Sequence, residues 1–247
     1  MIFRLIATFA LTLSPALCED TLDRSRLLSS DENVRGMAFE ELESKSTALS
    51  DADCIYLVER SADSTTAPNE SLFLLMSVFA SLNDPARNIP AGKKPQTLSP
   101  QSGNSLIGIA ENGTFSDELR TAAIRCLFFS FDKSEEGVSL ENRLFLLLSK
   151  NNPKKVRTAV VGSFQCFSLE RGSNLWNRVV AVLGDEKEDE FIRLRLVESL
   201  VTTAHHRLIS NEDVEHLFNI AFMVKNNSEV MRTKLLATEA DYRGAYD

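Results

Sequence analysis

Apolar and polar residues alternate along this chain with the period of an α-helix, in short segments separated by polar turns. Two segments are near copies, "SDELRTAAIRCLFFSF" at 116–131 and "NPKKVRTAVVGSFQCF" at 152–167. Each has a polar start, an aliphatic residue, Arg-Thr-Ala and then an apolar stretch. Within each copy, apolar residues recur three or four positions apart, which places them on one face of a helix. The chain therefore repeats a helical segment.

Five arginines mark the copies of this segment. Arg120, Arg157, Arg193 and Arg232 follow one another at intervals of 37, 36 and 39 residues, and Arg35 precedes them by 85, about two periods. An aliphatic residue or Met stands before each Arg, and an apolar residue follows seven later in all but the last copy. Because steps of four advance only about 40° around a helix, these positions form one stripe that we expect to be buried. The repeat positions are Val34, Arg35, Leu42, Leu119, Arg120, Leu127, Val156, Arg157, Phe164, Ile192, Arg193, Leu200, Met231 and Arg232.

A second set of apolar segments lies between the arginine segments. The arginine segments start at Ser30-Asp31, Ser116-Asp117, Asn152-Pro153, Asp189 and Asn227-Ser228, residue types that favour the first turn of a helix. The second set lies near 54–62, 105–112, 139–150, 173–185 and 213–226, and residues 69–82 fill the double-length gap without an Arg. The pattern predicts an all-α chain of about six helix pairs.

The arginine segments resemble the HEAT-repeat family. The best matches are "NVRGMAFEEL", "ELRTAAIRCL" and "KVRTAVVGSF". The resemblance implies an α-α superhelix, or solenoid, of about six stacked HEAT-like helix pairs across residues 19–247. The tetratricopeptide alternative would need a 34-residue period and a Trp/Gly/Tyr pattern that the chain lacks.

The chain departs from the HEAT pattern at one column. HEAT repeats commonly carry an Asp six residues before the Arg, which forms a ladder between units. The corresponding residues here are Ser29, Thr114, Asn151, Lys187 and Asn226. The partners of the arginines and the stacking angle therefore stay open.

The first residues have the layout of a secretory signal peptide. Arg4 is followed by an apolar run, Pro15 and small residues at Ala16 and Cys18, so we expect a signal peptide at 1–18 and a secreted or periplasmic protein. A lipoprotein anchor at Cys18 is the weaker alternative, because Leu17 stands where a small residue is expected. No later stretch reaches the roughly 20 apolar residues of a transmembrane helix, so none is expected after signal removal.

A proline-rich segment and the net charge of the chain indicate which classes of partner to expect. Residues 83–104 are rich in proline and predict a surface insertion, in which Lys93 and Lys94 are possible partner contacts. The chain has 27 basic and 35 acidic residues, a net charge of -8. A surface of this sign repels nucleic acid, so no nucleic-acid partner is expected.

Candidate catalytic residues are few. His205 and His206 point about 100° apart on a helix and cannot share a metal on one face. His206 and His216 could meet across a turn near Asp213 and Glu215, which is the one acid–base or metal arrangement to consider. The chain has no Cys-x-x-Cys, no His-Glu-x-x-His and no Gly-rich phosphate loop, so we expect no catalytic residue, metal or cofactor.

The remaining candidates have structural interpretations. After signal removal three cysteines remain, an odd number that argues against a disulfide framework; Cys54 and Cys126 are expected in the core, and Cys166 is undecided. The acidic run at 185–190 is expected in the turn before a helix. The basic run at 150–157 is either a solvated corner or a docking patch for an acidic partner. Trp176 is either a core residue or an exposed anchor for a partner.

These observations favour a non-catalytic scaffold that binds another protein or a peptide through the surface of stacked helix pairs. Two alternatives remain: a helical-repeat hydrolase or lyase that uses His206 and His216, and a purely architectural subunit of an exported assembly. Neither the partner nor the binding face follows from the sequence.

Overall fold

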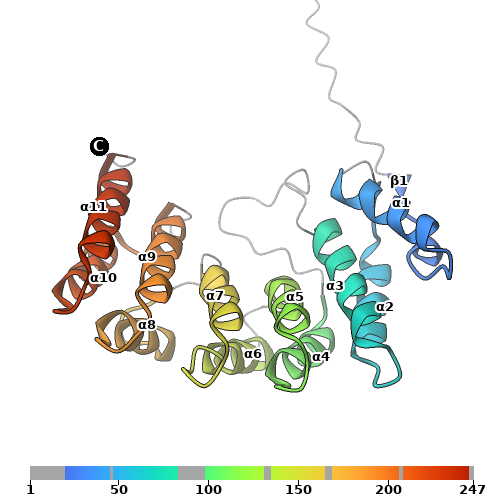
Figure 1. Cartoon of the computed structure of the whole chain (residues 1–247), viewed down its shortest axis with the longest axis horizontal. Coiled ribbons are helices and arrows are strands. Elements are labelled where there is room, and N and C mark those ends of the chain that lie inside the picture. Colours follow the sequence, from blue (N-terminus) through green and yellow to red (C-terminus); the bar gives the residue numbers. More distant parts are fainter. Residues whose placement is uncertain are drawn as a thin grey trace, which may run out of the picture.

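The chain folds as an all-α protein (Figure 1). A computed structural model describes residues 20–44, 47–82, 98–130, 135–164, 169–205 and 208–244. These residues form eleven α-helices, two 3-10 turns and a two-residue parallel strand pair. The helices are α1 (Glu32–Glu43), α2 (Asp51–Ala62), α3 (Pro68–Leu82), α4 (Pro100–Glu111), α5 (Asp117–Leu127), α6 (Glu135–Leu146), α7 (Lys154–Ser163), α8 (Asn174–Gly184), α9 (Glu190–His205), α10 (Asn211–Met223) and α11 (Glu229–Gly244). The 3-10 turns are η1 (Arg24–Arg26) and η3 (Phe128–Ser130), and the strands are β1 (Asp20–Thr21) and β2 (Thr47–Ala48).

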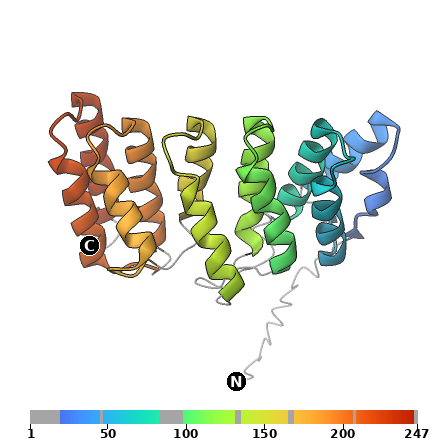
Figure 2. The same ribbon diagram turned by 90° about the horizontal axis from the view of Figure 1, so that it is seen from below.

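The helices form two layers. Each odd-numbered helix packs against the next odd-numbered helix, from α1 through α3, α5, α7 and α9 to α11, and the even-numbered helices pack in the same way from α2 to α10. The array bends, with the odd row on the inner side and the even row on the outer side (Figure 1). A view from below shows the helices standing side by side along the array (Figure 2).

The core lies between the two layers and contains the expected stripe. Eight stripe residues are each 2% exposed or less: Leu42, Leu119, Leu127, Val156, Phe164, Ile192, Leu200 and Met231. Val34 and Arg35, near the N-terminal end of the array, are half-buried. Burial of one such side chain stabilises the fold by about 1.5–3 kcal/mol. Helices of 10 to 16 residues are marginal alone, so packing between the layers supplies most of their stability.

The helix starts follow the predicted caps with one exception. Asp31 accepts a hydrogen bond from the amide of Asn33, and Ser116 accepts one from Leu119. Asp189 and Ser228 cap α9 and α11 in the same way, through the amides of Phe191 and Met231. Pro153 was expected as the first helical residue of α7. It lies one position earlier, at the N-cap, and makes no side-chain cap bond.

The proline-rich segment is shorter than predicted. Helix α4 begins at Pro100, so the last five residues of the predicted insertion at 83–104 are helical. The Ser99 hydroxyl accepts from the amide of Ser102, and proline suits the first turn of a helix because it lacks the amide that would be left unbonded there. The prediction erred because this first turn carries no large apolar residue. Residues 83–97, with Lys93 and Lys94, lie outside the described residues, as does the predicted signal peptide at 1–18 with Cys18.

Three of the five stripe arginines, Arg120, Arg157 and Arg193, join successive helices through hydrogen bonds of their buried side chains, whereas Arg35 donates to the carbonyl of Ser29 just before its own helix. Arg120 donates from Nε to the carbonyl of Ala110 at 2.8 Å and from Nη2 to the side-chain oxygen of Asn152 at 2.6 Å. Arg157 donates to the carbonyl of Leu148 at 2.8 Å and to the carboxylate of Glu188.

Arg193 continues this pattern and Arg232 ends it. Arg193 donates to Asn227 at 2.7 Å, whose amide donates in turn to the carbonyl of Ala221. Arg232, on the last helix, is exposed.

The side chains that accept these arginine hydrogen bonds all stand at one repeat position, five residues before the next arginine. The HEAT pattern instead has an Asp six residues before the Arg, so the expectation taken from that pattern missed the acceptors by one position. Asn152, Glu188 and Asn227 each stand five residues before an Arg, and Phe115 stands there before Arg120. The preceding helix of the row, α3, has Ser71 in the Arg column, because Ser71, like each of the arginines, is the fourth residue of its helix and its amide donates to the carbonyl four residues before it. The donor and the acceptor are thus missing together at this one junction.

No described helix is both long and apolar enough to cross a membrane.

Candidate functional site

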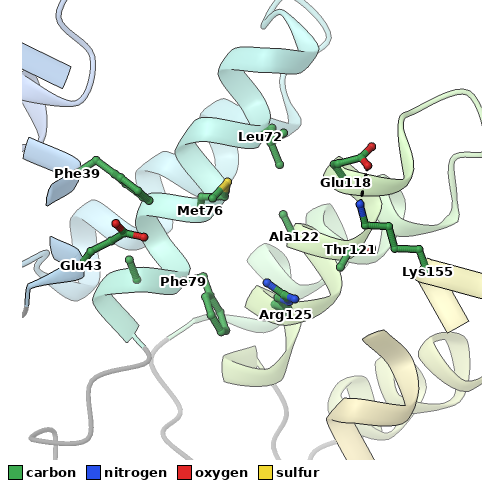
Figure 3. A pocket seen from close by; sticks show the side chains of 11 residues that line it. Phe39, Glu43, Leu72, Met76, Phe79, Glu118, Thr121, Ala122, Arg125 and Lys155 are labelled. Atoms are coloured by element: carbon green, nitrogen blue, oxygen red, sulfur yellow. Dashed lines mark hydrogen bonds and ion pairs between the residues drawn. The ribbon is translucent and has the colours of Figure 1, made fainter. Parts of the chain in front are cut away.

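A groove of about 540 Å³ crosses the inner row of helices (Figure 3). We call it the inner groove. Its apolar lining is Phe39 from α1, Leu72, Met76, Phe79 and Ala80 from α3, and Ala122 from α5. Its polar lining is Glu43 from α1, Glu118, Thr121 and Arg125 from α5, and Lys155 from α7. Four helices of one row therefore contribute side chains to one surface.

The repeat explains which residues face the groove. On α5 the groove residues are Glu118, Thr121, Ala122 and Arg125. They lie two positions before Arg120 and one, two and five positions after it, on the side of the helix away from the buried stripe. On α3 the Arg column holds Ser71, and Leu72 and Met76 lie one and five positions after it, as Thr121 and Arg125 do after Arg120. The inner side of α3 is therefore apolar as well as its buried side. Met76 is 45% exposed, a large value for an apolar side chain at the middle of a helix.

Aromatic contacts hold the apolar wall. The Phe79 ring meets the Phe129 ring edge-on with centroids 6.3 Å apart, and Phe39 contacts Phe73 at 5.8 Å. The Arg125 guanidinium lies 5.8 Å from the centroid of the Phe79 ring, within range of a cation–π interaction. Phe79 therefore fixes both the wall of the groove and the position of its cation.

The polar groups of the inner groove differ in how they are satisfied. Glu118 and Lys155 form an ion pair at 2.6 Å between α5 and α7, and the hydrogen bond from Lys155 lowers the pKa of the Glu118 carboxyl. Among the described residues, neither Glu43 nor Arg125 has an oppositely charged partner. Thr121 is 8% exposed, and its hydroxyl has no hydrogen-bond partner among the residues that the structure describes. A buried hydroxyl in this state costs roughly 1–3 kcal/mol, which a bonded ligand would recover.

Two cysteines lie behind this surface as core thiols. Cys54 and Cys126 are buried and unbridged, as the sequence indicated. The Cys126 thiol donates to the carbonyl of Leu75 at 3.2 Å, and burial raises its pKa, so it stays protonated and unreactive at neutral pH. Cys166 lies outside the described residues.

Trp176 and His216 contact each other on α8 and α10. Trp176 is 5% exposed, so it belongs to the core and is not an exposed partner contact. The two rings are stacked, with centroids 5.9 Å apart, and the Arg171 guanidinium lies 5.6 Å from the Trp176 ring. His206 and the side chain of His205 lie outside the described residues, which leaves the pairing of His206 with His216 undescribed. Asp213, expected near that pair, is bonded to Arg171 at 2.6 Å.

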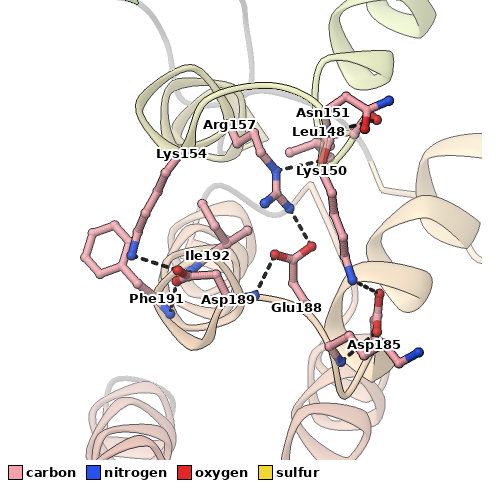
Figure 4. A network of polar contacts seen from close by, with 12 residues as sticks. Leu148, Lys150, Asn151, Lys154, Arg157, Asp185, Glu188, Asp189, Phe191 and Ile192 are labelled. Atoms are coloured by element: carbon pink, nitrogen blue, oxygen red, sulfur yellow. Dashed lines mark hydrogen bonds and ion pairs between the residues drawn. The ribbon is translucent and has the colours of Figure 1, made fainter.

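The basic run and the acidic run neutralise each other (Figure 4). Lys150 pairs with Asp185 at 2.6 Å, Lys154 pairs with Asp189 at 2.9 Å, and Arg157 pairs with Glu188. The acidic residues lie in the turn before α9, as predicted. Neither interpretation of the basic run included these pairs, because the sequence does not show that the two runs face each other across adjacent helix pairs.

Within the described residues, no group of three or more His, Cys, Asp and Glu side chains is placed to hold a metal ion. The inner groove combines an apolar wall with three polar groups that lack a partner in the described part of the chain: the Arg125 cation, the Glu43 anion and the Thr121 hydroxyl. Such a surface can hold an apolar side chain and orient the polar groups beside it.

Sequence reasoning missed the inner groove. The available signal was residues 69–82, where leucine, methionine and phenylalanine occupy positions on both sides of the helix.

No protein-family model matches the chain, and comparison with curated proteins and with solved structures likewise finds no match.

Proposed function

We propose that this chain is a non-catalytic scaffold, a HEAT-like α-solenoid that binds another protein or a peptide through its inner row of helices. The observation that carries the proposal is the inner groove, where apolar side chains from α1, α3 and α5 lie on one open surface with polar groups of α1 and α5 that have no partner among the described residues. Stacked helix pairs present extended surfaces suited to recognition of large partners. Apolar patches rimmed by polar residues are typical of interaction sites.

The HEAT-like interpretation draws support from the repeat geometry. Helices α2 to α11 make five hairpins, and α1 precedes them with η1 in the place of its first helix. The buried bonds from Arg120, Arg157 and Arg193 to the following unit form a ladder of the kind that the family builds with Asp. This repeat count is close to the six pairs that the sequence suggested.

The proposed location is outside the cytoplasm, and it rests on the signal-like residues 1–18 alone. An exported scaffold would meet its partner in the periplasm or in the medium. The binding experiment below should therefore be carried out with the full chain in cells that produce it naturally.

The test is photo-crosslinking from two positions. A photoreactive amino acid replaces Met76 in the inner groove, and in a matched variant it replaces Leu146, which is 55% exposed on α6 of the outer row. We expect a recurrent protein adduct from position 76 and none of that mass from position 146. Adducts of equal yield from both positions, or none from either, would contradict recognition through the inner row.

The two alternatives predict other outcomes. A hydrolase or lyase would lose its activity when His206 and His216 are replaced by Ala, whereas adduct formation by a scaffold would persist. An architectural subunit would show a substitution at position 76 changing the size of an assembly, measured by light scattering, whereas in a binding scaffold the same substitution would change the affinity for the partner.

A further inference from the structure

We infer that the inner groove binds an extended peptide segment in which an apolar side chain stands between a basic and an acidic residue. The inference rests on the proposed binding function and names the chemistry of the ligand. It depends on a contrast within the groove (Figure 3). The wall is apolar, and the two sides carry opposite charges, Glu43 and Arg125, that are unpaired among the described residues.

The apolar wall accounts for the central side chain of the ligand. Met76 and Phe79 lie side by side on α3, with Ala122 facing them from α5 (Figure 3). Methionine is flexible and polarizable, so it adapts to ligands of different shape. The small Ala122 leaves space opposite Met76. A leucine, methionine or phenylalanine of the ligand would bury its surface here.

The two unpaired charges account for the flanking residues. Arg125 is held against the Phe79 ring and has no carboxylate partner among the described residues. Its guanidinium is suited to a carboxylate of the ligand, which it can bind through two parallel hydrogen bonds. Glu43 lies on α1, on the other side of α3, and is likewise unpaired within the described ranges. It is complementary to a lysine or arginine.

The spacing follows from the helix row. Neighbouring packed helices lie about 10 Å apart, so α1 and α5 are separated by roughly 20 Å. An extended chain advances about 3.3 Å per residue, so a peptide that crosses the row covers this span in about six residues. The acidic and basic residues are therefore expected about five or six positions apart, with the apolar residue between them.

Thr121 supplies independent support for a polar ligand. Its hydroxyl is buried, has no hydrogen-bond partner within the described part of the chain and belongs to the lining of the same groove. The backbone of an extended peptide offers an amide and a carbonyl at every residue. One of these groups bonded to the Thr121 hydroxyl would satisfy it.

Peptide selection tests the inference. A phage-displayed library of random 12-residue peptides is selected on the wild-type protein and, in parallel, on Met76→Glu and Arg125→Glu. We expect peptides from the wild type to carry an apolar residue flanked by one acidic and one basic residue, and Met76→Glu to give no such enrichment. On Arg125→Glu the acidic position should change to Lys or Arg. No enrichment over Met76→Glu, or the same motif on Arg125→Glu, would overturn the inference.

A binding measurement on the best synthetic peptide sharpens the selection. Fluorescence anisotropy should show about a tenfold weaker Kd for Arg125→Glu, about 1.4 kcal/mol by the usual conversion. Replacement of the acidic peptide residue by Lys should restore the affinity of that variant to within about twofold of the wild-type pair, because the charges are then opposite again. Leu146→Glu, on the outer row, is the control and should leave Kd unchanged. Failure of the charge exchange to restore binding would also contradict the inference.

The outcomes separate this inference from the proposed function. If position 76 crosslinks a partner while peptide selection yields no charged motif, the scaffold function stands and the ligand chemistry proposed here is wrong. If neither experiment gives a product, both proposals are wrong. Far-ultraviolet circular dichroism and thermal unfolding of each variant show whether a lost signal reflects lost folding.

Discussion

The junction of α7 with α9 and the junction of α3 with α5 are built from neighbouring helices of the same row, but their side chains differ in chemistry. At the first, Arg157 and Glu188 are 5% and 7% exposed and bonded to each other, and two surface ion pairs flank them (Figure 4). At the second, the Arg column holds Ser71. The neighbouring surface is the inner groove, in which the Thr121 hydroxyl and the Arg125 guanidinium have no hydrogen-bond or ion-pair partner among the described residues (Figure 3).

The presence or absence of a hydrogen-bond partner therefore distinguishes polar groups that stabilise the array from polar groups that are available to a ligand. Buried polar groups in folded proteins are almost always hydrogen-bonded, and those without a partner require an explanation. At the α7–α9 junction the buried polar side chains, Arg157 and Glu188, are bonded to each other. The α3–α5 junction leaves groups for which the protein itself, within its described ranges, supplies no partner.

The largest expected effect on the free energy of unfolding is at the α7–α9 junction, where the buried charges are paired. Glu188→Ala leaves the Arg157 guanidinium buried without its carboxylate, and loss of one partner of a buried ion pair costs about 3–5 kcal/mol. The free energy of unfolding, measured by urea denaturation, should fall by that amount.

The matched control removes both charges. Arg157→Leu combined with Glu188→Leu should be less destabilised than Glu188→Ala alone, because no uncompensated charge remains. A double variant at least as unstable as the single one would show that packing around these side chains, and not charge burial, determines the loss.

The next effect compares two buried threonines. Thr121→Val removes a hydroxyl that no described residue bonds, and it should raise the free energy of unfolding by about 1 kcal/mol. Thr203→Val removes a hydroxyl that donates to the backbone, 2.8 Å from the Ser199 carbonyl, and should lower it by about 1 kcal/mol. Equal changes of the same sign in thermal unfolding would refute the distinction between the two sites.

The periodic elements of the fold were predictable from the sequence because each copy repeats the same physical signals. The apolar stripe through Leu119, Val156 and Ile192 is buried as expected, and the cap residues start their helices. The start of α4 was missed because its first turn carries a Ser-Pro start without large apolar residues. Such a start is visible only when cap chemistry is given as much weight as hydrophobic periodicity.

The groove and the arginine acceptors were harder to predict, for different reasons. The acceptors could have been found, since Asn152, Glu188 and Asn227 share one column, and Phe115 breaks that column next to the helix that lacks the Arg. The groove joins residues of four helices that lie far apart in the chain. Their proximity depends on how neighbouring units stack, which the repeat pattern does not specify.

A smaller effect concerns acid stability at the α7–α9 junction. The hydrogen bond from Lys150 is the main cause that lowers the pKa of Asp185 in the folded state. A lowered carboxyl pKa contributes stability above the unfolded value of about 3.9, and that contribution is lost as pH falls through the folded pKa. Lys150→Ala should therefore flatten the dependence of thermal stability on pH below about 4. A variant whose pH profile still parallels the wild type would show that this surface pair contributes nothing to folding.

The smallest effect on stability is expected in the inner groove, where the effect on binding should be greatest. Met76 is nearly half exposed, so Met76→Gln should change the free energy of unfolding by less than about 0.5 kcal/mol, as surface substitutions usually do. Urea denaturation measures this change, and the buried neighbour Leu75→Ala, which is expected to cost about 2–5 kcal/mol, provides the control. A large loss of stability from Met76→Gln would mean that this side chain supports the fold. The exposure of Met76 would then have a structural reason and would no longer argue for a ligand.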